Sequence, residues 1–261
     1  GLHRLGRRRA VLPRRPGVHV STGHVTLVGG GPGAWDLITL RGMRALQDAD
    51  VILTDHLGPT DELSQLCETA EKTVIDVSKL PYGRQVAQEE TNRLLVEHAL
   101  AGRHVVRLKG GDPYVFGRGY EELEACREHA IPCAVVPGVT SAISVPGAAG
   151  IPVTQRGVVH SFTVVSGHLP PGHPHSLVDW PALARAGGTI SVIMGVRHVA
   201  AITATLIDAG LHPTTPAAVI QEGTTDQQRS FRCTLGTLAQ TMKVNDVTSP
   251  AVYVIGDVAG L

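Results

Sequence analysis

From His24 onward, short apolar runs alternate with segments of helical periodicity, and this alternation constrains the fold more than any other feature. In the first half, the predicted strands are 24–31, 50–55, 73–77, 104–111 and 132–138. The predicted helices between them are 38–49, 61–70, 88–102 and 120–130. Strands separated by helices form a parallel sheet with helices on both faces, and such sheets bind ligands at the carboxyl ends of their strands.

A second α/β unit is predicted after residue 157. Its predicted strands are 161–167, 189–195, 216–223 and 250–257, with an extended, antiparallel strand at 227–236 and a helix at 196–210. The intervening segment 137–157 is rich in Pro, Gly and small residues, so we place the domain junction within it. The expected fold class is therefore α/β with two domains, 24–137 and 138–261, and a ligand cleft between them.

The first 23 residues carry six arginines and no acidic side chain, which indicates a basic flexible arm, a transit segment or the remnant of a longer chain. The rest of the chain has more acidic than basic residues, so a nucleic-acid partner is not expected. No apolar run approaches the ~18 residues of a membrane span. Four cysteines without C-x-x-C spacing argue against zinc and disulfides and favour the cytoplasm.

The histidine-rich loop 167–176 could suggest a metal. Its prolines and its lack of carboxylates favour a surface loop instead. No metal site is therefore expected.

A glycine-rich loop follows the first predicted strand in "VTLVGGGPGAWD". The glycines at 29, 31 and 33, with Ala34, match the G-x-G-x-x-G/A pattern, and Asp55 follows about twenty residues later, as in dinucleotide-binding folds. Pro32 disturbs that pattern, because a pyrophosphate loop needs backbone N–H groups and proline has none. A NAD-dependent dehydrogenase and a tight turn without ligand both stay open on this evidence.

The stretch "RLKGGDPYVFGRG", residues 107–119, ends another predicted strand in two glycines and an Asp-Pro pair. Glycines allow a close approach to the main chain, and Asp-Pro fixes a turn. A turn alone does not explain Arg118 and the aromatic residues.

Several motifs in this order resemble the uroporphyrinogen-III C-methyltransferase family of tetrapyrrole methylases. They are "LVGGGPG", "QEETN", "RLKGGDPYVFGRG", "VVPGVTSAIS", "GIPVTQR", "VVSGHL" and "IMG", and they span about residues 24–258. The resemblance implies two α/β domains with S-adenosylmethionine in the cleft. It implies methylation of uroporphyrinogen III at C-2 and C-7 to precorrin-2, for sirohaem or cobalamin, with S-adenosylhomocysteine as product. It also implies a homodimer.

The resemblance further implies which residues form the site. The cofactor contacts would be Pro32, Gly110, Gly111, Asp112, Val115, Thr140, Ser141, Met194 and Gly223. Asp55 would be the catalytic base and Lys79 the acid. Arg118 and Glu121 are further catalytic candidates, because at i and i+3 near a helix start they could share a face toward the cleft; a helix-end ion pair is the alternative.

The substrate carries eight carboxylates, so cations from cleft loops are needed, and the candidates are Arg41, Lys79, Arg84, Arg118 and Arg156. Two positions depart from the family pattern: Ala34 replaces an Asp, and His56 replaces an Arg. A related methylase acting on a later corrinoid is the second interpretation, and the dehydrogenase is the third.

Overall fold

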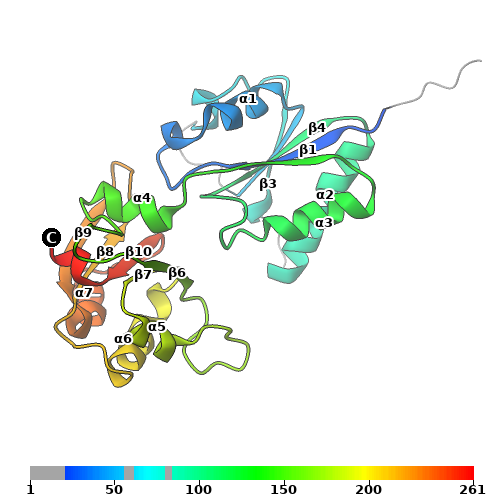
Figure 1. Cartoon of the computed structure of the whole chain (residues 1–261). Helices are drawn as coiled ribbons and strands as arrows, with labels where there is room; N and C mark the ends of the chain where they lie inside the picture. The colour runs from blue at the N-terminus through cyan, green and yellow to red at the C-terminus, as the bar shows by residue number, and fades with distance from the viewer. Residues whose placement is uncertain (1–20, 56–61, 80–83) are drawn as a thin grey trace, which may run out of the picture.

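The computed structural model describes residues 21–55, 62–79 and 84–261, except for the side chains of 79 and 84–86. Two five-stranded sheets form two lobes, and the segment after the last strand of the first lobe leads into the second (Figure 1). Most of the predicted basic arm, and His56, lie outside the described residues. Among the helices of the described residues, none is long and apolar enough to cross a membrane.

The first sheet has the strand order β3-β2-β4-β1-β5, and all of its strand pairs are parallel. Its strands are β1 (His24–Gly29), β2 (Val51–Thr54), β3 (Thr73–Asp76), β4 (His104–Lys109) and β5 (Cys133–Val136). Its helices are α1 (Leu40–Asp48), α2 (Arg84–Leu100) and α3 (Gly119–Glu128). The parallel sheet predicted from the alternation is confirmed. Its strands therefore all end at one edge, here named the carboxyl edge, and all begin at the opposite amino edge.

Apolar side chains cover both faces of this sheet. Leu27 on β1 packs with Leu95 of α2 and Leu123 of α3, whereas Val28, its neighbour in sequence, packs with Leu46 of α1 on the other face. Figure 1 shows α1 on one side of the sheet and α2 and α3 on the other. Each fully buried leucine of this kind stabilises the fold by about 1.5–3 kcal/mol, so both layers hold the strand ends in fixed positions.

The second sheet is mixed, with the order β6-β7-β10-β8-β9, and only the β6–β7 pair is parallel. Its strands are β6 (Phe162–Ser166), β7 (Thr189–Ile193), β8 (Pro216–Gln221), β9 (Arg229–Thr234) and β10 (Ala251–Ile255). Its helices are α4 (Ser141–Ala148), α5 (Trp180–Ala186), α6 (Val199–Asp208) and α7 (Leu238–Val244). The predicted antiparallel strand near the end of the chain is confirmed as β9.

Short 3-10 helices complete the described elements: Trp35–Leu37, Leu63–Gln65, Val77–Lys79, Val196–His198, Leu235–Thr237 and Asp257–Gly260. The hydrophobic clusters of the first sheet extend to Val136, and those of the second begin at Ala142. The predicted domain boundary at 137/138 falls between these two limits and stays a prediction.

Two local predictions need correction. The predicted helix 61–70 is only the 3-10 turn Leu63–Gln65 in its described part, because this turn alone already places Leu66 and Cys67 in the core against α1 and β2. The helical periodicity of 38–49 predicts an apolar face formed by Leu40, Met43 and Leu46, and this is wrong for Leu40, which is 67% exposed.

Helix α4 lies inside the segment that the sequence indicated as a Pro- and Gly-rich junction. In a helix the N–H of residue 146 would donate to the carbonyl of Ala142, but Pro146 has no backbone N–H. The Ser191 hydroxyl of β7 donates to that carbonyl instead, at 2.7 Å. A contact from the second sheet therefore makes a helix possible in a sequence that locally disfavours one.

Candidate active site

Three backbone segments meet at the carboxyl edge of the first sheet. The Gly30 N–H donates to the Lys109 carbonyl at 2.6 Å, and Gly31 and Gly111 exchange backbone hydrogen bonds of 3.3 and 2.7 Å. A Cβ on Gly138 would lie 2.1 Å from the Gly111 carbonyl oxygen. Glycine is therefore required where the loops after β1, β4 and β5 pack backbone against backbone.

One side of this meeting point is open. A Cβ on Gly110 would have no heavy atom within 4 Å, and one on Gly111 would reach only the Thr140 Cα, at 4.0 Å. Gly111 also has a φ of 65°, which a side chain would strain. The open surface of Gly110 and Gly111, here named the glycine cradle, can receive a ligand directly against the main chain.

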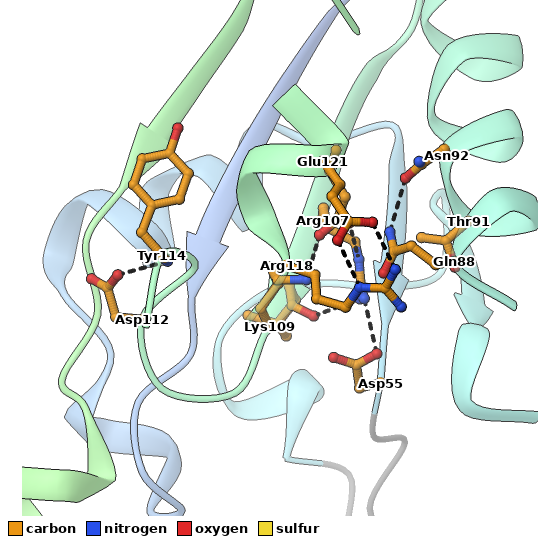
Figure 2. Close-up of polar contacts among 12 residues, drawn as sticks. Asp55, Gln88, Thr91, Asn92, Arg107, Lys109, Asp112, Tyr114, Arg118 and Glu121 are labelled. Atoms are coloured by element: carbon orange, nitrogen blue, oxygen red, sulfur yellow. Dashed lines mark hydrogen bonds and ion pairs between the residues drawn. The ribbon is translucent and has the colours of Figure 1, made fainter. Parts of the chain in front are cut away.

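Asp112 fixes the shape of the loop that carries the cradle. Its Oδ1 accepts from the Tyr114 N–H and its Oδ2 accepts from the Gly138 N–H, both at 2.9 Å. Figure 2 shows the first of these bonds. The carboxylate thus ties the loop after β4 to the loop after β5, and Val115 follows as a half-buried residue of the same loop.

Residues that follow β8 of the second sheet contact the glycine-rich loop that follows β1. The Ala34 N–H donates to Thr224 Oγ1 at 3.0 Å, and a Cβ on Gly33 would lie 2.9 Å from the Gly223 carbonyl oxygen. Gly223 is buried against Val145 of α4. The structure therefore brings the half-buried Pro32, which precedes Gly33, close to the predicted contact Gly223.

Thr140 and Ser141 begin α4, and Thr140 Oγ1 accepts from the Ala142 N–H at 3.4 Å as an N-cap. Met194 follows β7, is 47% exposed, and has a φ of 54°. Positive φ in such a residue costs roughly 1–3 kcal/mol and is typical of functional sites. The neighbouring backbone is held because the buried Tyr253 hydroxyl donates to the Gly195 carbonyl at 3.0 Å.

Asp55 follows the last residue of β2 at the same carboxyl edge, and its side chain is 36% exposed. Its Oδ1 accepts from Arg107 Nη2 at 2.9 Å, while Arg107 Nε donates to Glu122 Oε2 at 2.6 Å. Lys109 Nζ donates to the other oxygen of Glu122. Figure 2 shows the Arg107 guanidinium pointing at Asp55. This ion network of two cations and two carboxylates anchors Asp55 to Arg107, which lies three residues before Gly110 in the sequence.

The ion network is buried apart from Asp55, since Arg107 and Lys109 are each 4% exposed and Glu122 is 0% exposed. Burial disfavours the charged form of Arg107, but the attraction of Glu122 and Asp55 outweighs it and raises the pKa of Arg107. Burial, reinforced by the positive charge of Arg107, lowers the pKa of Lys109 although Glu122 opposes this. The carboxylate of Glu122 is therefore needed to hold both cations in a site with little water.

Arg118 and Glu121 do pair, with Nε to Oε1 at 2.9 Å and Nη2 to Oε2 at 2.7 Å, at the start of α3. The predicted alternative of a helix-end ion pair is thus present, and a role toward substrate stays a prediction. Arg41 and Arg156 are exposed. The side chains of Lys79 and Arg84 lie outside the described residues, so their predicted roles stay predictions.

Sequence reasoning missed Arg107, Lys109 and Glu122. A signal was present, because Arg107 and Lys109 alternate within an otherwise apolar strand and so project to the same face of the sheet. Charged residues on a buried strand are rare unless they are paired. The partner Glu122 is one of several acidic residues at the start of α3, and only the packing of α3 on the sheet singles it out.

The dinucleotide interpretation does not fit this topology. In a dinucleotide fold β1 and β2 are neighbours, so that the acid ending β2 lies beside the first glycine loop. Here β4 separates β1 from β2, and Asp55 is bonded to Arg107 of β4. In addition, the N–H groups of Gly30 and Gly31 already donate to the carbonyls of Lys109 and Gly111, which leaves them unsuited to a pyrophosphate.

Known proteins are similar to this chain. The model of the family described as tetrapyrrole (corrin/porphyrin) methylases matches residues 24–239. A siroheme synthase of Nitrosomonas europaea is 45% identical over 92% of the chain, and the chain spans only about half of that protein, 50% of its length. A protein of Methanosarcina barkeri named S-adenosyl-L-methionine-dependent uroporphyrinogen III methyltransferase is 44% identical, over 92% of the chain and 93% of its own length.

A solved structure has the same fold. The uroporphyrin-III C-methyl transferase from Thermus thermophilus, complexed with S-adenyl homocysteine, has a TM-score of 0.72 and 38% identity. The match covers 91% of this chain and 99% of that one.

Proposed function

Because the chain belongs to the tetrapyrrole methylase family, we propose that it transfers methyl groups from S-adenosylmethionine to C-2 and C-7 of uroporphyrinogen III. The product is precorrin-2, on the route to sirohaem or cobalamin. The observation that carries the proposal is the open glycine cradle beside the ion network that ends in Asp55.

The residues of the cradle fit the cofactor. A bulky ligand can lie on Gly110 and Gly111 only because neither carries a side chain, and a Cβ on Gly110 would occupy space that is open. In the proposed site, Asp112, Val115, Thr140 and Ser141 would contact the cofactor from the segments after β4 and β5, and Pro32 and Gly223 from the segments after β1 and β8. Met194 completes the proposed set.

S-adenosylmethionine, when bound, supplies a methyl group on a positively charged sulfur and leaves as S-adenosylhomocysteine. The protein holds the two reactants in line, and such positioning is worth ~7–11 kcal/mol. Asp55 accepts the proton that the methylated pyrrole must lose, and its half-exposed carboxylate can be reached from outside. Arg107 orients this carboxylate, and Lys79 is the proposed proton donor.

Arginine side chains bind the carboxylates of the substrate. Arg41 and Arg156 are exposed, and the Arg118 side chain is 38% exposed, with its guanidinium paired to Glu121. Arg84 belongs to the same proposed set. A planar guanidinium suits a carboxylate because it donates two parallel hydrogen bonds.

We further propose that the protein works as a homodimer in the cytoplasm. Four cysteines without a disulfide among the described residues agree with a reducing compartment.

The test is anaerobic incubation of the purified chain with uroporphyrinogen III and methyl-labelled S-adenosylmethionine. Two labelled methyl groups per tetrapyrrole, with the mass of precorrin-2, are expected. A parallel incubation with precorrin-2 as substrate distinguishes this activity from that of a methylase that acts on a later corrinoid. Methylation of precorrin-2 without methylation of uroporphyrinogen III would contradict the proposal.

A further inference from the structure

A cluster of three potential metal ligands lies at the amino edge of the first sheet, the edge opposite to the candidate active site. His24 and His104 are the first residues of β1 and β4 and face each other in register, and Asp48 is the last residue of α1. One ligand atom from each of the three side chains lies within 4.8 Å of the other two.

His104 is held in a defined orientation. Its side chain is 8% exposed, its Nε2 lies 2.9 Å from the Thr26 hydroxyl, and Asp50 Oδ2 accepts from its backbone N–H at 2.8 Å. Metal-binding histidines typically have one ring nitrogen held by such a bond, which directs the other nitrogen to the ion.

The other ring nitrogen, Nδ1, faces the carboxylate of Asp48 without a well-directed hydrogen bond. His104 Nδ1 lies 3.1 Å from Asp48 Oδ2, but it is buried and makes no hydrogen bond in the described structure. Buried polar nitrogens are almost always satisfied, so this one calls for an explanation. If Nε2 carries the proton and donates it to Thr26, the Nδ1 lone pair faces a carboxylate. A cation between them resolves that opposition.

Lys72 bonds to the backbone on either side of Asp48. Lys72 Nζ donates to the backbone carbonyls of Gln47 and Ala49, at 2.7 and 2.6 Å, beside Asp48. The His24 ring stacks on the His104 ring, with centroids 4.0 Å apart and planes at 15°. Because His24 is exposed, its ring can rotate so that a nitrogen points at an ion bound to His104.

We propose that His24, Asp48 and His104 bind a divalent transition-metal ion, zinc in the first instance, with water completing its coordination. Two imidazoles and one carboxylate form a ligand set that suits zinc better than magnesium or calcium, which prefer oxygen. The ion would join β1, β4 and α1 at their ends, away from the chemistry. No metal site is expected from the sequence, because the cysteines lack C-x-x-C spacing and the histidine-rich loop lacks carboxylates. His24, Asp48 and His104 come from three separate segments without motif spacing.

The test is calorimetric titration of zinc into the untagged chain of 261 residues and two variants, His24→Gln and Asp48→Asn. One zinc ion per chain is expected at this site, and each variant should bind it at least ~10-fold more weakly. The matched control is the double variant His173→Gln/His175→Gln, because these loop histidines are the obvious source of unspecific binding. The control should bind zinc like the unmodified chain.

Cobalt reports the ligands directly, because its visible absorption depends on coordination geometry. We expect a cobalt band in the unmodified chain and in the loop control, and its loss in His24→Gln. Zinc should also raise the melting temperature of the unmodified chain and leave that of His24→Gln unchanged. No zinc binding to the unmodified chain, or equal binding by His24→Gln, would overturn the proposal. Loss of binding in the loop control alone would place the metal in the loop instead.

Discussion

Replacing Glu122 with glutamine tests the buried ion network most sharply. The substitution keeps the shape of the side chain but removes the charge that Arg107 and Lys109 share. Glu122 is 0% exposed and the two cations are each 4% exposed, so water cannot replace it. Removing one partner of a buried ion pair costs about 3–5 kcal/mol, and we expect a loss in that range. In urea, the unfolding midpoint should then fall by about 1–2 M.

The neighbouring Glu121 provides a matched control. Its ion pair with Arg118 is exposed, with side-chain exposures of 46% and 38%, so Glu121→Gln should cost no more than ~1 kcal/mol. Urea unfolding of both variants, followed by circular dichroism, measures the difference. An unfolding midpoint of Glu122→Gln within error of that of Glu121→Gln would refute the argument.

The same variant has a predictable pH dependence. The folded-state pKa of Lys109 is lowered by burial and Arg107, and Glu122 is what opposes this shift. Without Glu122 the pKa of Lys109 in the folded state should fall further. Between that lowered pKa and the ordinary pKa of lysine, Lys109 is then protonated in the unfolded state but neutral in the folded state. Stability therefore rises with pH in this window. The stability deficit of Glu122→Gln should shrink from neutral to alkaline pH, whereas a constant deficit would assign the loss to packing.

Three further predictions concern the site. Gly110→Val should abolish binding of S-adenosylhomocysteine without loss of stability, because its Cβ enters open space, whereas Gly147→Val, at another open glycine, should bind normally by calorimetry. Asp55→Asn should lower single-turnover methylation by ~10²–10⁴ and leave cofactor affinity nearly unchanged; full activity would remove Asp55 from the mechanism. Light scattering at micromolar concentration should give the mass of a dimer, and a monomer would reject the proposed assembly.

Much of the fold could be predicted because its local signals agree with its tertiary structure. The central strands β1 and β2 are buried and read as apolar runs, and Gly29 and Gly138 are glycines because the loops there pack backbone on backbone. Helix α4 could not be predicted. The Ala142 carbonyl, which Pro146 cannot bond, is satisfied by Ser191, and Ser191 lies 45 residues beyond Pro146 in the sequence. The segment 61–70 has helical periodicity, yet a single turn suffices to bury its apolar residues.

The site could be predicted in part. Two adjacent glycines after a strand indicate that the main chain must stay uncovered or adopt a positive φ. In the structure Gly110 has open space where a side chain would be, and Gly111 has a positive φ. The ion network could not be predicted in the same way, because Asp55, Arg107 and Glu122 come from three elements and only their packing joins them. The cluster of His24, Asp48 and His104 could not be predicted for the same reason, because the register of β1 and β4 brings the two histidines together.

Calorimetric titration of the unmodified chain with S-adenosylhomocysteine, and separately with NAD, tests the central claim most directly. The open glycine cradle and the occupied N–H groups of Gly30 and Gly31 predict saturable binding of one S-adenosylhomocysteine per chain and no binding of NAD. Tighter binding of NAD than of S-adenosylhomocysteine would contradict the account.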